Sequence, residues 1–385
     1  MEFDLSPEQK AMRDSARRFA ADQLASGYAA REREGKLDRA LVRRMGELGL
    51  IAPELPEAVG GLGVDCVTAG LVIEAIAGAD FNVSYVQLLG SLLGAILVAH
   101  GRPEIAHPVV RGICEGRQLV ALGLTEAGAG SDAANLTLKA RRTNTGYVLD
   151  GEKTSISLAD QADQIVVFAR AGTVKERARG VSAFLVPMHV KGITTNRFDD
   201  LGSGAVGRGV VHFDGVEVAH ENRLGEEGRG FSQVMQGFDF SRALIGLQCL
   251  AAARASLAET WSYIQQRQAF GQPIARFQGV TEPLAEAETL LGAAELLCYK
   301  TLWLRDQGLP HTTEAAMVKW WAPKTAFETI HRCLLTHGHA GYSRDLPHQQ
   351  RLRDVLGLQI GDGTEQVQKM VIAREKIGRV VLPHG

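Results

Sequence analysis

The hydrophobic pattern of this 385-residue chain changes its period twice, and that change constrains the fold more than any single motif. Up to about residue 116 the segments are rich in Ala, Leu, Glu and Arg, which favours helices, and Ser6 with Gln9 predicts a capping box. Residues 165–168, 181–186 and 210–213 are short runs of Val, Ile and Phe that are typical of strands. After residue 230, apolar residues recur every three or four places. The pattern predicts an α+β fold with an N-terminal helical domain (1–119), a middle antiparallel β domain (120–226) and a C-terminal helical bundle (227–385).

Turn signals refine this prediction. Residues 144–146 and 150–151 read as hairpin or turn sequences flanking a short strand, and no long helical pattern separates the strands. An antiparallel sheet or small barrel is therefore favoured over a Rossmann fold, which needs helices between its strands. Two long amphipathic helices joined at residues 270–273 suggest antiparallel neighbours in an up-down bundle.

Charge and cysteine content exclude several classes of partner. Lys and Arg number 42 against 44 for Asp and Glu, so a net charge of −2 gives no reason to expect nucleic acid or an anionic membrane. The apolar stretch 88–98 is about half of the roughly 20 residues that span a bilayer, and we expect a buried helix. The acidic start shows no signal peptide, and five cysteines without C-x-x-C spacing argue against disulfides and zinc. We expect a cytoplasmic protein without a metal, nucleic-acid or membrane partner.

Six segments carry residues suited to chemistry. Residues 123–132 read G-L-T-E-A-G-A-G-S-D, in which glycines allow close backbone approach and the Thr125 and Ser131 hydroxyls can hold phosphate or a flavin edge. Alone, such a run is more often a surface turn. The other five are G-E-K-T-S-I-S-L (151–158), F-D-F-S-R (238–242), R-Q-A-F-G with a glutamine eleven residues after the arginine (267–278), L-T-H-G-H-A-G-Y (335–342) and I-G-D-G-T-E-Q (360–366).

These segments resemble motifs of the acyl-CoA dehydrogenase family. The corresponding family patterns are T-E-P-G-A-G-S-D, G-x-K-x-W-I-T-N, F-D-x-x-R, R-x-x-F-G, Q-I-x-G-G-x-G-Y and E-G-T-x-Q-I-Q. The resemblance covers the β domain and the C-terminal bundle, whereas the N-terminal domain is similar only in its helical character. It implies a four-helix C-terminal bundle, FAD as cofactor, an acyl-CoA substrate, electron-transferring flavoprotein as acceptor and a homotetramer.

The resemblance also implies roles for individual residues. Asp362 stands where the family's glutamate removes the α-proton of a thioester, and it shortens the base by one C–C bond, roughly 1.5 Å. Cofactor contacts are implied for Leu122, Leu124, Thr125, Ser131, Ser155, Ser157, Arg267, Phe270, Gln278, Leu335, Gly338, Thr364 and Gln366. Substrate contacts are implied for Ser131, Asp239, Arg242 and Gly363. In the family, the segment around Arg267 binds the FAD of the neighbouring subunit.

Several positions depart from the family pattern. Ser155 replaces tryptophan, Ala127 replaces proline, and Lys369 and Gly204 stand where relatives have arginine. Some relatives carry the base just before the arginine of F-D-x-x-R, but Ser241 here cannot act as a carboxylate base. His331, His337 and His339 are expected to be structural rather than metal ligands.

An aspartate base is characteristic of the cyclohexanecarboxyl-CoA dehydrogenase branch. We therefore expect α,β-dehydrogenation of a cyclic acyl-CoA, cyclohexane-1-carbonyl-CoA to cyclohex-1-ene-1-carbonyl-CoA. Three different functions stay open beside it: a dehydrogenase for branched or straight-chain acyl-CoA, a flavin oxidase similar to nitroalkane oxidase, and a catalytically silent flavin- or CoA-binding homologue.

Overall fold

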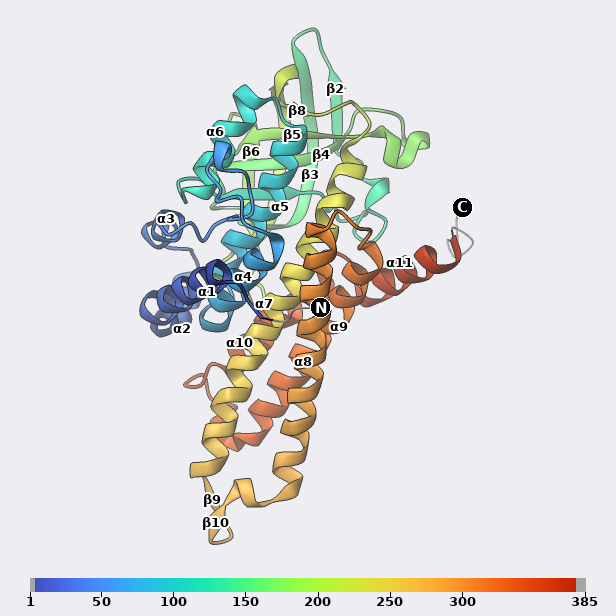
Figure 1. Cartoon of the computed structure of the whole chain (residues 1–385). Helices are drawn as coiled ribbons and strands as arrows, with labels where there is room; N and C mark the ends of the chain where they lie inside the picture. Colours follow the sequence, from blue (N-terminus) through green and yellow to red (C-terminus); the bar gives the residue numbers. More distant parts are fainter. Residues whose placement is uncertain (1–3, 379–385) are drawn as a thin grey trace.

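The computed structural model describes residues 4–378 and shows helices, then a sheet, then helices again (Figure 1). The N-terminal part consists of α1 (Pro7–Phe19), α2 (Tyr28–Glu34), α3 (Arg39–Glu47), α4 (Cys66–Ala79), α5 (Ser84–His100) and α6 (Pro103–Cys114). Ser6 and Gln9 form the expected capping box at the start of α1. Helix α5 is buried along most of its length, which confirms the expectation for residues 88–98. No helix within residues 4–378 combines the length and apolarity that a membrane crossing needs.

The middle part is one eight-stranded sheet. Its strands are β1 (Val120–Gly123), β2 (Lys139–Arg142), β3 (Gly146–Ser157), β4 (Gln164–Arg170), β5 (Val181–Pro187), β6 (Ile193–Arg197), β7 (Arg208–Ala219) and β8 (Arg223–Leu224). The order is β6-β7-β3-β2-β4-β5-β8, with β1 beside β4. The three runs of Val, Ile and Phe lie in β4, β5 and β7, as predicted.

Two details of the sheet differ from the sequence prediction. The turn at residues 144–146 does join β2 to β3, but residues 150–151 lie inside β3, where Gly151 (φ 135°) marks a register shift against β7. A glycine in a strand often marks a bulge, so the same residue type misled the turn prediction. The sheet is also not purely antiparallel, because β1 pairs in parallel with β4. Strand β2 also pairs in parallel with β4 at Lys139, so the connection from β1 to β2 keeps the strand direction and the β2–β3 hairpin then reverses it.

The C-terminal part is helical and contains the longest helix. Its elements are α7 (Gly230–Gln266), α8 (Gln278–Asp306), α9 (Thr312–Thr336), α10 (His348–Ile360) and α11 (Glu365–Ile377), with the short strands β9 (Gln268–Ala269) and β10 (Gln272–Pro273) between α7 and α8. Helices α7 to α10 pack together, while α11 packs on α9 and projects away from the others (Figure 1). Helices α4 and α5 pack on α7, so the N-terminal helices and the bundle share one hydrophobic core.

Candidate active site

Asp362 lies in a tight loop between α10 and α11, which we call the base loop (residues 361–364). Helix α10 is followed by Gly361, and Asp362 (φ 55°) and Gly363 (φ 101°) both have left-handed backbone conformations. Asp tolerates this conformation better than most residues, because its short side chain can bond locally. Left-handed non-glycine residues are concentrated at functional sites, and Ser155 (φ 59°) and Phe270 (φ 52°) are two further cases among the predicted site residues.

The base loop is tied to its surroundings by side chains that donate to its carbonyls. The Gln368 Nε2 group donates to Asp362 O at 3.0 Å and to Gly363 O at 3.3 Å. Lys319 Nζ donates to Leu358 O at 2.7 Å and to Gly363 O at 3.2 Å. Ser241 Oγ donates to Asp362 Oδ2 at 3.3 Å. The loop therefore has one conformation that is specified from α7, α9 and α11.

Two other predicted substrate residues lie on α7 beside this loop. The buried Arg242 guanidinium donates from Nη1 to Asp239 Oδ1 at 3.0 Å and lies 5.6 Å from the centre of the Phe238 ring. Thr312 Oγ1 donates to Asp239 Oδ2 at 2.6 Å. The structure thus brings Asp239 and Arg242 close to Asp362 and Gly363. Arg242 bonds to Asp239 and makes no direct hydrogen bond to the Asp362 carboxylate.

The electrostatic surroundings of Asp362 suit a base. Burial of the carboxylate raises the pKa of Asp362, although the residue keeps some solvent exposure, and the positive charges of Lys319 and Arg242 oppose that rise. Burial lowers the pKa of Lys319 to about 8. A carboxylate with a raised pKa is a stronger proton acceptor, and the nearby cations favour its ionised form.

The predicted flavin-facing residues lie on β1, on β3 and in the loop after β1. Leu122 is in β1, Leu124 and Thr125 follow it, and Ser155 and Ser157 are near the end of β3. The two segments are joined by a buried ion pair, Lys153 Nζ to Glu126 Oε1 at 2.7 Å, and Lys153 Nζ also donates to Leu124 O at 3.0 Å. Thr154 N donates to Thr125 O at 2.9 Å. Two motifs that are far apart in sequence therefore form one unit.

This unit has polar groups that a flavin edge can use. Thr125, Ser155 and Ser157 are each partly exposed. Within residues 4–378, no hydrogen bond of the structure uses the hydroxyls of Thr125 or Ser157. Hydroxyls at the ends of strands that are free to donate fit the polar edge of an isoalloxazine ring, so the residues present are compatible with FAD.

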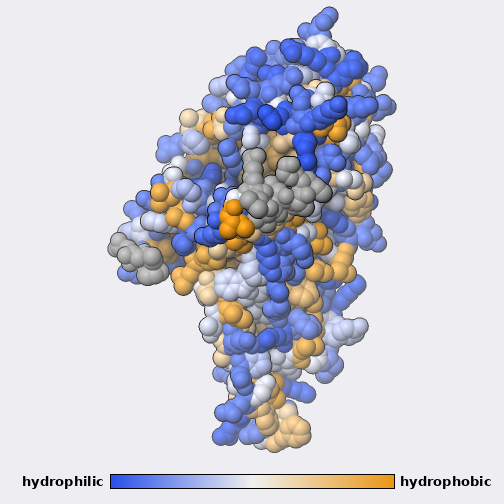
Figure 2. All heavy atoms as spheres, turned by 90° about the vertical axis from the view of Figure 1, so that its right-hand side faces the viewer, coloured by the Kyte–Doolittle hydropathy of each residue, from blue (hydrophilic) through white to orange (hydrophobic). Residues whose placement is uncertain are grey.

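Five other predicted cofactor residues lie far from the base, at the opposite end of the bundle from the sheet (Figure 1). We call them the distal tip: Arg267, Phe270, Gln278, Leu335 and Gly338. All five are exposed, Phe270 at 95% and Leu335 at 61%. Tyr263 stacks on His337 with ring centres 4.1 Å apart, which joins the end of α7 to the end of α9. Hydrophobic atoms appear at this lower end of the molecule in Figure 2.

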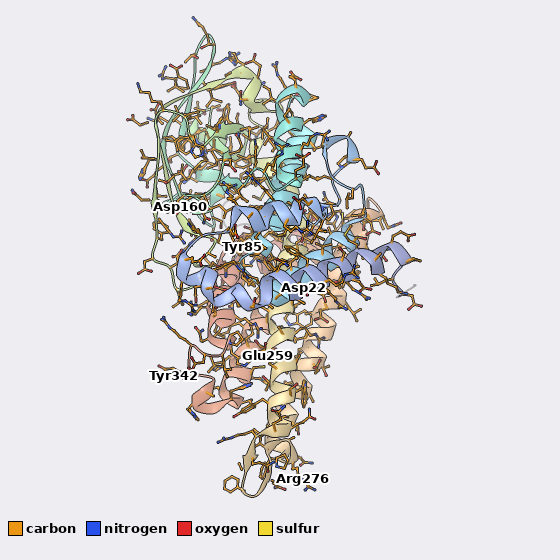
Figure 3. All side chains as sticks on the ribbon, turned by 90° about the vertical axis from the view of Figure 1, so that its left-hand side faces the viewer. Asp22, Tyr85, Asp160, Glu259, Arg276 and Tyr342 are labelled. Carbon is orange, nitrogen blue, oxygen red and sulfur yellow. The ribbon has the colours of Figure 1, made fainter. Side chains whose placement is uncertain are left out.

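Figure 3 shows how far apart the two regions are. Burial raises the pKa of Tyr85, and the charge of Asp362 raises it further. Tyr85 lies in the middle of the molecule, whereas Arg276 lies at the lower end beside the distal tip. The remaining predicted residues lie elsewhere. Ser131 is exposed on the loop after Glu126, Thr364 is the N-cap of α11, and Gln366 is exposed in its first turn.

Sequence reasoning missed three buried charged residues: Lys319, Glu126 and Lys153. Lys319 is 1% exposed and lies on the apolar face of α9 with Ala315, Ala322 and Ala326. A lysine on the buried stripe of an amphipathic helix was a usable signal, because an ammonium group is rarely buried without a purpose. Glu126 and Lys153 lie inside the quoted motifs but had no assigned role.

No group of three or more metal-ligating side chains occurs within the part of the chain that the structure describes. His337 packs between Tyr263 and His348. Cavities of about 540 Å³ and 510 Å³ lie elsewhere, and none of the predicted site residues lines either of them. The predicted site is therefore recognised by its polar contacts rather than by an empty volume.

Comparisons with known proteins agree with this arrangement. The chain matches family models described as the acyl-CoA dehydrogenase N-terminal domain (residues 6–117), middle domain (121–216) and C-terminal domain (228–377). Benzylmalonyl-CoA dehydrogenase of Aromatoleum aromaticum is 36% identical over 97% of this chain and 99% of the relative. The CarC subunit of the caffeyl-CoA reductase-Etf complex of Acetobacterium woodii is 32% identical over 96% of this chain and 98% of the relative.

Solved structures give the same result. Butyryl-CoA dehydrogenase from Megasphaera elsdenii has a TM-score of 0.94 at 30% identity and covers 98% of this chain and 100% of that one. PigA, solved with FAD and proline, has a TM-score of 0.94 at 25% identity, with the same coverage. Two of these similar proteins are named for benzylmalonyl-CoA and butyryl-CoA, and none of the four supports the predicted placement in the cyclohexanecarboxyl-CoA branch.

Proposed function

The chain belongs to the acyl-CoA dehydrogenase family, and we propose that Asp362 is the base that removes the α-proton from its thioester substrate. The activity of the chain is FAD-dependent dehydrogenation of an acyl-CoA. The observation that carries the proposal is the base loop itself. It places a partly buried carboxylate of raised pKa beside two cations, in a backbone conformation that three neighbouring side chains specify.

In the proposed dehydrogenation, each proton and electron pair has a defined acceptor. The C–H bond at the α-carbon breaks and its proton goes to a carboxylate oxygen of Asp362, while the electron pair forms the α,β double bond. FAD, when bound, accepts the β-hydrogen with two electrons. Negative charge that develops on the thioester oxygen needs donors fixed in advance, and the backbone N–H of Asp362 is the donor that we assign from this chain.

For the substrate, we propose an acyl group that carries a ring. A ring fixes its α-proton in space, so a shorter base leaves more room for the ring than glutamate would. Ser155 is the second support, since it is a small, partly exposed side chain at a register shift of β3 where the family pattern has tryptophan. Cyclohexane-1-carbonyl-CoA is the first candidate. Benzylmalonyl-CoA is the second, because the relative that acts on it is 36% identical.

A panel of thioesters tests this proposal. The oxidised protein is mixed anaerobically with cyclohexane-1-carbonyl-CoA, benzylmalonyl-CoA, isobutyryl-CoA and butyryl-CoA, and the loss of flavin absorbance is followed. We expect the ring-bearing thioesters to reduce the flavin fastest. Equal or faster reduction by butyryl-CoA would contradict the ring proposal and favour a straight-chain dehydrogenase.

Flavin reduction and oxygen uptake also distinguish the dehydrogenase from a silent homologue and from an oxidase. A silent homologue would leave the flavin oxidised with every thioester. An oxidase similar to nitroalkane oxidase would consume oxygen without an added acceptor. For the dehydrogenase we propose electron-transferring flavoprotein as acceptor, supported by the CarC relative, which is a subunit of a complex with Etf. We also propose a homotetramer in which the distal tip contacts the FAD of a neighbouring subunit, supported by the exposure of all five tip residues.

A further inference from the structure

Lys319 is an almost completely buried lysine on α9 whose ammonium group bonds to backbone rather than to a carboxylate. It is 1% exposed, and its Nζ donates to Leu358 O at 2.7 Å and to Gly363 O at 3.2 Å. Leu358 lies in the last turn of α10, where carbonyls have no partner within the helix. A cation at this end also interacts favourably with the helix dipole.

These two carbonyls lie on either side of Asp362 in the chain. Leu358 precedes it by four residues and Gly363 follows it directly, so one ammonium group links the end of α10 to the far side of the base loop. Asp362 has a left-handed backbone (φ 55°), a conformation that is strained for a non-glycine residue and persists only when its surroundings hold it. Gln368 holds the loop from α11 through Asp362 O and Gly363 O. Lys319 is the only one of these groups on α9.

We propose that Lys319 is a positioning residue, whose ammonium group holds the base loop in the conformation that directs the Asp362 carboxylate and backbone N–H at the substrate. The inference rests on the proposed role of Asp362 as the base. Burying an ammonium group is costly, and capping one helix end does not require it, because a neutral donor or water could do so. A buried cation beside a base has a second effect, since it favours the ionised carboxylate.

The charge effect involves ionisable groups on every neighbouring helix. The charge of Asp362 interacts with Lys319 on α9, Arg242 on α7 and Tyr85 on α5. Asp239 on α7 and Arg374 on α11 act in turn on Arg242, and Cys249 on α7 acts on Lys319. Arg242 already bonds to Asp239, which compensates part of its charge. Lys319 has no such carboxylate partner within residues 4–378, so its charge acts on Asp362 more directly. Burial lowers the pKa of Lys319 to about 8, and below that pH it is charged.

The test compares Lys319→Met with Lys319→Arg and with a control on the same helix. Met keeps the apolar stem and removes the charge and the donors, whereas Arg keeps both. Arg332→Met removes a partly exposed cation of α9 that pairs with Glu286 on α8 and not with the base loop. For Lys319→Met we expect kcat/KM to fall about 100-fold and the acid limb of its pH profile to move about one unit higher. Lys319→Arg is expected to keep the acid limb at the wild-type pH, and Arg332→Met to behave as the wild type.

A second readout does not depend on turnover. In protein stripped of FAD, the carboxyl band of Asp362 is isolated by infrared difference against Asp362→Asn and titrated with pH. We expect the midpoint to rise in Lys319→Met, and amide exchange of residues 361–364 to become faster. An unchanged midpoint together with unchanged amide exchange would overturn the inference. If Lys319→Met does not fold, Lys319→Gln takes its place, because Gln can donate a hydrogen bond without a charge, and the same two outcomes decide.

These readouts separate the inference from the proposed function. If no thioester bleaches the flavin of the wild type, the proposed function fails while the infrared titration still reports on Lys319. If the wild type turns over, and both the Asp362 titration and the amide exchange of residues 361–364 are the same in Lys319→Met, only the inference about Lys319 fails.

Discussion

The base loop and the distal tip both belong to the C-terminal helical domain, yet they differ in how complete they are within one chain. The base loop receives hydrogen bonds from α7, α9 and α11, and its neighbours Ser241 and Lys319 are buried. The distal tip is exposed, and within residues 4–378 the side chains of Arg267 and Gln278 make no hydrogen bond. On the roles proposed above, one chain orders the surroundings of the base by itself, whereas the distal tip offers exposed groups to a neighbouring subunit.

The largest expected effect is on the base loop. Asp362→Asn keeps the size of the side chain and removes its ability to accept a proton. We expect the rate of anaerobic flavin reduction to fall about 10³-fold, the middle of the range for loss of a general base. The flavin spectrum of the purified variant and its FAD content serve as controls, since both should match the wild type. Undiminished reduction would remove Asp362 from the mechanism.

The second effect concerns the buried ion pair between Glu126 and Lys153, which joins the loop after β1 to β3 within one chain. Lys153→Met leaves the Glu126 carboxylate buried beside Leu124, Thr125 and Thr137 without its cation. We expect the free energy of unfolding to fall by about 3 kcal/mol, because breaking a buried pair leaves an uncompensated charge. Denaturant unfolding of the FAD-free protein measures this. Lys139→Met, an exposed lysine of β2, is the matched control and should change the free energy of unfolding little.

The third effect lies at the distal tip. Arg267→Ala removes an exposed guanidinium group, so the free energy of unfolding should stay unchanged while FAD binds about 10- to 100-fold more weakly, the range for a lost charged hydrogen bond. FAD titration of the stripped protein measures the affinity. Arg276→Ala, at the same end of the bundle in Figure 3, controls for the loss of charge. Equal FAD affinity of the Arg267→Ala variant and the wild type would mean that the tip does not bind the cofactor.

The sequence predicted those parts of the molecule that depend on local pattern. The change of period near residues 120 and 230 indicated the strands and the long helices, because burial on one face repeats every two or every 3.6 residues. The parallel pairing of β1 with β4 and the bulge at Gly151 were missed, since both depend on neighbours that are distant in the chain. Lys319 was missed for the same reason. Its task depends on two backbone carbonyls of α10 and the base loop, which no local spacing relates to α9.

The smallest expected effect distinguishes between one chain and two. If the distal tip binds the cofactor of a neighbouring subunit, an assembly of Asp362→Asn and Arg267→Ala subunits contains sites with an intact base from one chain and an intact tip from the other. Random pairing of equal amounts makes about a quarter of all sites complete, because half of the pairs are mixed and each has one complete site. At an FAD concentration that fills sites with an intact tip but not sites with the Arg267→Ala tip, we expect the unfolded and refolded mixture to recover about that fraction of wild-type activity, above the average of the two variants alone. Activity equal to that average would mean that the base and the tip act on the FAD of the same chain. The two regions would then have to approach each other by a movement of the bundle.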